Sequence, residues 1–194
     1  MLPIAESIER QFPGAVLESA EAFGEQTVVV AREAIVPVCR WLRDEPSLVF
    51  AQLSDLTAVD WPERPERFDV VYQLNSLRDH RRLRLKARVP LSDCEIESVT
   101  SVWQSANFLE REVFDLMGIR FRHHPDLRRI LMPEDYAEGH PLRKDFPVVG
   151  KGWRNTFEFW PAIGPGSEVA VPVDASALGL PARPAPSAKN GTSA

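Results

Sequence analysis

Cysteine is scarce in this chain of 194 residues, and the scarcity excludes two classes of protein. The two cysteines, Cys39 and Cys94, stand alone, without the paired spacing that is typical of zinc or iron–sulfur ligands. A disulfide-rich secreted scaffold would also need more of them. We therefore expect a reducing compartment, and no iron–sulfur cluster ligated by this chain alone.

Long apolar runs are lacking as well. No stretch approaches the roughly 20 apolar residues that cross a bilayer, so we expect no transmembrane segment. The first ten residues, MLPIAESIER, lack the apolar core of a signal peptide. The sequence therefore predicts a protein that stays on the cytoplasmic side.

Several catalytic and nucleotide-binding motifs are missing too. The sequence contains no G-x-S-x-G, no phosphate-binding G-x-x-x-x-G-K-S/T and no G-x-G-x-x-G. The formal net charge of -5 disfavours a nucleic-acid-binding protein. Serine-nucleophile catalysis and nucleotide binding thus have no support.

A hydrophobic content of 44% is enough for one ordinary domain with a sizeable core. Near the N-terminus we expect a short helix over residues 2–11 and then a hairpin that turns at Phe23 and Gly24. The firmer strand of that hairpin ends in the β-branched run TVVV. A helix is predicted over residues 33–44, with Pro37 in its first turn.

Three strands are expected next, as an antiparallel meander over residues 49–61, 68–77 and 81–89. In the third strand, four apolar residues alternate with four basic ones, so one face should be buried and the other basic. The basic residues are Arg82, Arg84, Lys86 and Arg88. A nucleic-acid-binding module is one interpretation, but a solvated outer face is favoured because no aromatic residues interleave with the charges.

A second helical region is predicted over residues 99–117, broken near Ser105, with Ser98 as N-cap and Gly118 after its end. Two large aromatic side chains, Phe108 and Phe114, fall outside its apolar stripe. This helix should therefore have a second surface to bury, against the chain itself or against another protein.

Charged residues of the same helix point in different directions. Glu110 and Glu112 should project about 160° apart, so they cannot act on one substrate. We expect Arg111 to pair with Asp115, one turn further along.

After Gly118 the helical period stops, and four prolines make a long regular element improbable. We expect an irregular docking arm over residues 119–171 that is rich in hydrogen-bond donors for a partner. A metal site built from His123, His124 and His140 with Asp126, Asp135 or Glu138 is the alternative, as in a stand-alone hydrolase. Adjacent histidines project to opposite sides of an extended backbone, which favours structural or interfacial roles.

The domain organisation that follows is an α+β core over residues 1–118, the docking arm over 119–171 and a disordered Ala/Pro-rich tail over 172–194. Trp153, Phe157, Phe159 and Trp160 are too many large rings for a free segment, so this part of the arm should dock on something.

At the docking arm the sequence resembles a known family. The run E-R-E-x-x-D followed by G-I-x-F, H-P-D-L-R-R-I-L and G-H-P-L-R-K-D-F-P is similar to the 30-kDa subunit (the C subunit) of respiratory complex I. The resemblance is close over residues 110–147 and looser from about Leu48, where LSDLTAVDW is also similar. It implies a single α+β domain with a mixed or antiparallel sheet that helices cover.

The resemblance also implies a function. Such a subunit is non-catalytic: it binds no cofactor, and the FMN and iron–sulfur clusters belong to partner subunits. It packs on the 49-kDa-type subunit (the D subunit) near the quinone module of the NADH:quinone oxidoreductase. It lies peripherally on the cytoplasmic face of the inner membrane. A homologous subunit of a membrane-bound hydrogenase or of a plastoquinone-reducing complex is the alternative.

The family motif assigns roles to thirteen residues. Glu110, Arg111, Glu112 and Asp115 are expected to hold the helix and the docking arm together. The others are expected to face the partner or to brace the docking arm, and they are His124, Pro125, Arg128, Arg129, His140, Pro141, Arg143, Lys144 and Asp145. One departure is that GKGWRNTFEFWP, after residue 149, does not match the usual family tail.

Overall fold

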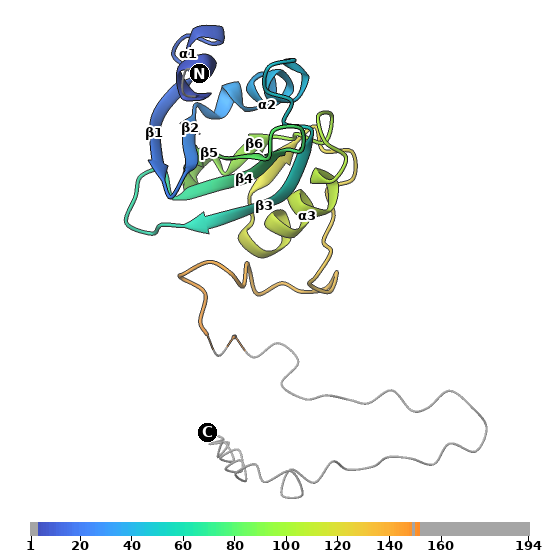
Figure 1. Ribbon diagram of the computed structural model, residues 1–194. Helices are drawn as coiled ribbons and strands as arrows, with labels where there is room; N and C mark the ends of the chain where they lie inside the picture. Colours follow the sequence, from blue (N-terminus) through green and yellow to red (C-terminus); the bar gives the residue numbers. More distant parts are fainter. Residues whose placement is uncertain (1–3, 149, 152–194) are drawn as a thin grey trace, which may run out of the picture. The chain divides into compact units, whose positions relative to one another are not determined.

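A five-stranded sheet with the strand order β1-β2-β5-β4-β3 is the centre of the fold (Figure 1). The computed structural model describes residues 4–148, 150 and 151, so the predicted tail and the aromatic segment after residue 151 lie outside it. The strands are β1 (Val16–Ala22), β2 (Glu25–Val30), β3 (Gln52–Asp60), β4 (Phe68–Ser76) and β5 (Arg81–Val89).

The predicted hairpin and the predicted meander both form. β1 pairs with β2, β3 with β4, and β4 with β5, all antiparallel. The hairpin then joins the meander through a parallel pairing of β2 with β5, in which Val30 lies opposite Ala87. The sheet is therefore mixed, and the α+β class expected from the sequence is confirmed.

Three helices bury their apolar stripes against one face of this sheet. They are α1 (Ile4–Gln11), α2 (Ile35–Asp44) and α3 (Ala106–Met117). Fully buried side chains such as Ile8, Leu42 and Ala106 form one core cluster with Tyr72 and Leu85 of the strands. None of the helices in the described part of the chain is both long and apolar enough to cross a membrane.

The other face of the sheet carries the basic row of β5, as the alternation predicted. Cations of this row are paired with carboxylates of other strands: Arg88 with Glu18 of β1 at 2.6 Å, and Lys86 with Asp69 of β4 at 3.7 Å. Such compensation of charge supports the interpretation of this row as a structural outer face rather than as a nucleic-acid site.

A small parallel sheet of β6 (Glu95–Glu97) and β7 (Arg120–Arg122) was not predicted. It places the chain before α3 beside the chain after it. The predicted start at residue 99 was wrong, because residues 99–105 form turns and irregular chain, but the predicted break near Ser105 agrees with the start of α3 at Ala106. Ser98 is therefore not its N-cap; its hydroxyl instead donates to Glu110 Oε2 at 2.7 Å.

Candidate functional site

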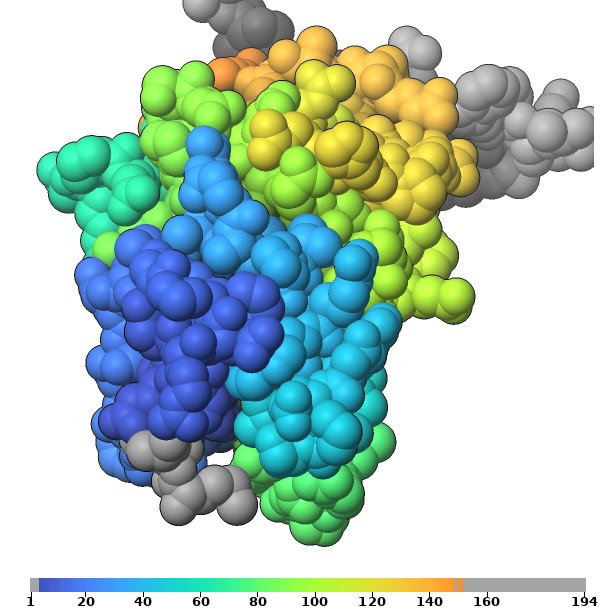
Figure 2. Space-filling model, turned by 90° about the horizontal axis from the view of Figure 1, so that it is seen from above, coloured from blue at the N-terminus to red at the C-terminus, as the bar shows by residue number. Residues whose placement is uncertain are grey.

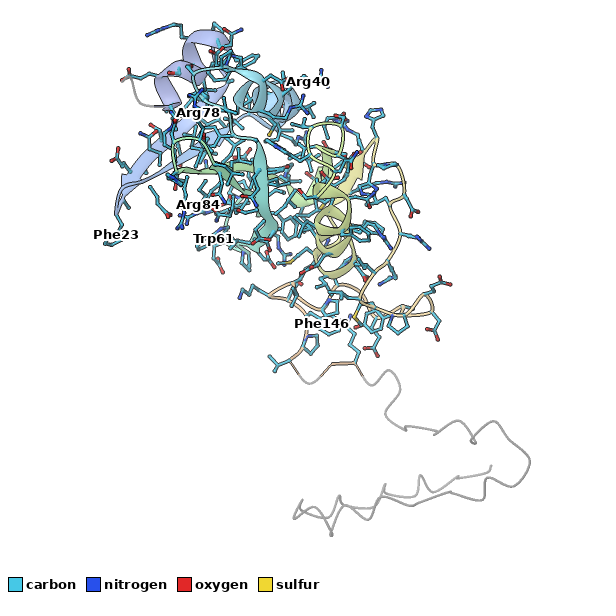
Figure 3. The ribbon with its side chains drawn as sticks, turned by 45° about the vertical axis from the view of Figure 1, so that its right-hand side comes forward. Phe23, Arg40, Trp61, Arg78, Arg84 and Phe146 are labelled. Carbon is cyan, nitrogen blue, oxygen red and sulfur yellow. The ribbon has the colours of Figure 1, made fainter. Side chains whose placement is uncertain are left out.

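The predicted site residues gather on α3 and on the chain that follows β7. In Figure 2 the yellow chain after β7 lies directly against the green surface of α3, and Figure 3 shows Phe146 in the segment that passes below the end of this helix. The hydrogen bonds described next explain why an irregular, proline-rich segment takes this path.

Arg111 holds the backbone of the docking arm from one side. Its buried guanidinium donates from Nε to the carbonyl oxygen of Arg128 and from Nη2 to that of Arg129, both at 3.1 Å. It also lies over the ring of Phe108, 5.6 Å from the ring centroid. The predicted Arg111–Asp115 pair was wrong, because the loop crosses this face of the helix and its carbonyls take the guanidinium.

Asp115 holds the same loop one helical turn away. Its buried Oδ2 accepts three consecutive backbone N–H groups, those of Ile130, Leu131 and Met132, at 2.8–3.0 Å. Its Oδ1 pairs with Arg129 at 2.9 Å. Burial would raise the pKa of Asp115, but these four donors outweigh it, and the pKa lies below its ordinary value.

Glu110 faces the interior instead. It accepts from Ser98 Oγ and from the backbone N–H of Val99, each at 2.7 Å. Burial raises its pKa to about 7 against the lowering effect of these two bonds. Glu112 is exposed, so the two carboxylates do point apart as predicted and cannot act on one substrate.

The adjacent histidines also point apart, although the prediction assumed an extended backbone and His123 has φ +60°. The imidazole of His123 is exposed and lies 2.7 Å from Glu97, whereas that of His124 is fully buried. His124 Nδ1 accepts the N–H of Asp126, so Nε2 carries the proton and donates to the carbonyl of Asn107 at 3.0 Å. Both nitrogens of His124 are thus used in holding the turn.

The metal-site alternative gains no support. Within residues 4–148, 150 and 151, no group of three His, Cys, Asp or Glu side chains is placed to hold a metal ion.

The second half of the motif supplies donors to the C-terminal carbonyls of α3, which have no partners inside the helix. His140 Nδ1 lies 3.1 Å from the Asp115 carbonyl, and Arg143 Nε donates to the Met117 carbonyl at 2.6 Å. The N–H of Leu142 donates to the carbonyl of Leu116 at 3.1 Å. Burial lowers the pKa of His140.

A buried ion pair then ties the docking arm to the end of β3. Arg67 Nε donates to Asp60 at 2.6 Å, and its Nη1 reaches Asp145 at 2.9 Å. Asp60 also accepts the backbone N–H of Lys144 at 2.7 Å. Sequence reasoning missed Asp60 and Arg67 as site residues, although Asp60 lies in the run LSDLTAVDW that resembles the family.

Most of the predicted polar residues are therefore used within the chain. Five of the thirteen motif residues are exposed, and they are Glu112, Pro125, Arg128, Lys144 and Asp145. The same region also exposes large apolar side chains, and they are Phe108, Ile130, Leu131 and Leu142. Of these, the sequence analysis had singled out only Phe108. We call these four the apolar ridge.

Comparisons with known proteins agree on one family. The model of the family "Respiratory-chain NADH dehydrogenase, 30 Kd subunit" matches residues 28–152. The C subunit of NADH-quinone oxidoreductase from Geobacter sulfurreducens is 53% identical over 144 residues, which cover 74% of this chain and 87% of the relative. The same subunit of Rhodobacter capsulatus is 47% identical over 148 residues, 76% of this chain and 73% of the relative.

Solved structures show the same fold. A trypsin-resistant fragment (1-134) of Nqo5 is 35% identical, with a TM-score of 0.54, and the match covers 64% of this chain and 96% of the fragment. A chain of an archaeal membrane-bound sulfane sulfur reductase shares the fold at 20% identity, with a TM-score of 0.61 over 87% of this chain and 97% of that chain. Sequence and fold together place this chain in the family of the 30-kDa subunit of NADH-quinone oxidoreductase.

Proposed function

We propose that the chain is a non-catalytic subunit of the peripheral arm of proton-translocating NADH:quinone oxidoreductase, where it packs on the 49-kDa-type subunit near the quinone module. The observation that carries this proposal is the way in which the residues of the family motif are bonded. Its buried polar groups fix the docking arm to α3, while apolar side chains are left exposed beside them. Such an arrangement suits binding of a protein better than catalysis.

In this role the chain supports electron transfer without carrying electrons. FMN and the iron–sulfur clusters would be bound by partner subunits, and the peripheral arm would lie on the cytoplasmic face of the membrane. The purified chain alone should show no flavin absorbance and no stoichiometric iron. The division at residues 118 and 171 belongs to the same proposal, and so do the roles of the thirteen motif residues in holding the docking arm to the helix, in bracing it or in facing the partner.

Co-purification tests the proposal. The chain is tagged after Ala194, membranes are solubilised in a mild detergent, and the recovered proteins are identified by mass spectrometry. We expect a 49-kDa-type subunit together with flavin- and cluster-bearing subunits. Recovery of the tagged chain alone would contradict assembly. Hydrogenase-type neighbours would contradict the assignment of NADH as electron donor.

A further inference from the structure

We propose that the 128–132 loop is a preformed docking element, which α3 holds so that the apolar ridge enters an apolar recess of the neighbouring subunit. This inference rests on the proposed function and adds to it the docking surface, the chemistry of its partner and the residues that position it. In this view Arg111 and Asp115 are positioning residues that contact no partner themselves.

The first step of the argument is the fixation of the loop backbone. Two residues one helical turn apart bind five successive residues of the loop: Arg111 takes the carbonyls of residues 128 and 129, and Asp115 takes the N–H groups of residues 130, 131 and 132. Both of these side chains are buried. The loop therefore has one backbone conformation although it contains no helix or strand.

The second step is the exposure of the side chains that this loop presents. The exposed fraction is 58% for Leu131, 62% for Phe108 and 53% for Leu142. Phe108 lies at the start of α3, and Leu142 is bonded to Leu116 near its end, so the ridge follows the helix for about 12 Å. Several large apolar side chains exposed along one helix are a feature of binding surfaces rather than of free surfaces.

The third step concerns charge. The two arginines beside Ile130 and Leu131 already have partners: Arg129 pairs with Asp115, and Arg128 pairs with Asp126 at 2.9 Å. A nucleic acid or an acidic peptide would have to displace these carboxylates. An apolar recess in a protein needs no such displacement, so it is the complementary partner.

Preorganisation makes this surface effective. A loop that is already fixed loses little conformational entropy on binding, so more of the apolar burial appears as affinity. Removing the bonds to Asp115 should therefore weaken binding even though the ridge side chains stay intact.

The test compares three variants of the tagged full-length chain in its own membranes. Leu131→Asp should reduce recovery of the 49-kDa-type subunit about tenfold or more. Leu77→Asp is the matched control, because Leu77 is 65% exposed but lies outside the ridge, after β4; it should recover partners as wild type does. Wild-type recovery with Leu131→Asp, or an equal loss with Leu77→Asp, would overturn the inference.

Asp115→Ala tests positioning, because Asp115 accepts the N–H groups of residues 130, 131 and 132. Hydrogen exchange at these three amides should become about tenfold faster in the isolated full-length chain, while the strands stay protected, and recovery of the partner should fall. Unchanged exchange or unchanged recovery would contradict the role of Asp115. These results differ from failure of the proposed function, in which the wild-type chain itself recovers no oxidoreductase subunits.

Discussion

Two carboxylates of α3, Glu110 and Asp115, are both buried, yet their pKa values move in opposite directions. Asp115 meets three N–H groups and a guanidinium, and its pKa is lowered. Glu110 meets one N–H and one hydroxyl, and burial raises its pKa to about 7. The number and charge of the donors, rather than burial alone, therefore decide which form of each carboxyl is favoured.

Glu110 should make stability depend on pH near neutrality. Because its pKa is raised in the folded state, its contribution is full below about pH 4.5 and is lost as the pH rises through about 7. The loss amounts to at most about 3 kcal/mol. Glu110→Gln keeps an acceptor for Val99 and stays neutral. We expect it to remove this fall in the free energy of unfolding, as measured by urea denaturation between pH 5 and 8.

The comparison has to be made between variants, since His140 acts in the opposite sense. Its lowered pKa gives stability that is lost as the pH falls below about 6.5. The difference between wild type and Glu110→Gln cancels this contribution. An equal pH profile for the two proteins would show that Glu110 does not titrate near 7.

The Arg67–Asp60 pair is the other residue-scale determinant of stability. Arg67→Met should lower the free energy of unfolding by about 3–5 kcal/mol, because the fully buried carboxylate of Asp60 loses its guanidinium. Arg78→Met removes an exposed pair with Asp79 and an exposed bond to the Pro46 carbonyl, and it should cost only about 1 kcal/mol. Urea titration of both variants checks the contrast, and similar losses would refute it.

At the scale of elements, the junction between α3 and β7 is built around Gly118. The residue has φ +75°, as expected from its predicted position after the helix, and the imidazole of His140 and guanidinium of Arg143 fill the space where a Cβ would lie. The glycine is therefore required both by the backbone turn and by the close approach of the docking arm.

Gly118→Ala should lower the free energy of unfolding by about 2–4 kcal/mol, of which about 1–2 kcal/mol is the cost of positive φ. Gly24→Ala is a control with φ +78° and open space around its Cβ, so it should show the conformational cost alone. Thermal unfolding of the two variants separates the cost of positive φ from the cost of displacing His140 and Arg143. Equal losses would mean that His140 and Arg143 move aside without cost.

The elements that the sequence predicted correctly are those with a local signal. The alternation in β5, the Phe23-Gly24 turn and the stripe of α2 each depend on neighbouring residues only. The β6–β7 sheet and the start of α3 at Ala106 depend on contacts between distant segments, such as the Ser98–Glu110 bond. No periodicity within a window of the sequence could show them.

The site was predicted only in part, again because contacts between distant segments leave no local signal in the sequence. The resemblance identified the residues of the motif, including Arg111 and Asp115, but the bonds they make are to backbone groups of residues 128–132. Backbone groups carry no sequence signature, so charge complementarity suggested the incorrect Arg111–Asp115 pair instead. The exposed Leu131 could be found only once the loop path was known.

At the scale of the whole molecule, the described residues 4–148, 150 and 151 belong to one unit by their contacts. We expect a chain truncated after Trp153 to unfold within about 3 °C of the full-length chain, because the buried core and the bonds that hold the docking arm lie before that point. Thermal unfolding followed by circular dichroism measures this. A large drop would show that residues 154–194 contribute to the stability of the unit.

Because β2 pairs with β5, the first hairpin has to wait for a later strand during synthesis of the chain. Val30 leaves the ribosome well before Ala87, its partner across the sheet, and at roughly 5–20 residues per second the interval is about 3–11 seconds. Throughout that time the first hairpin has one edge without its final neighbour. The first part of the protein to be made therefore has to wait for the last strand of the meander before it reaches its native surroundings.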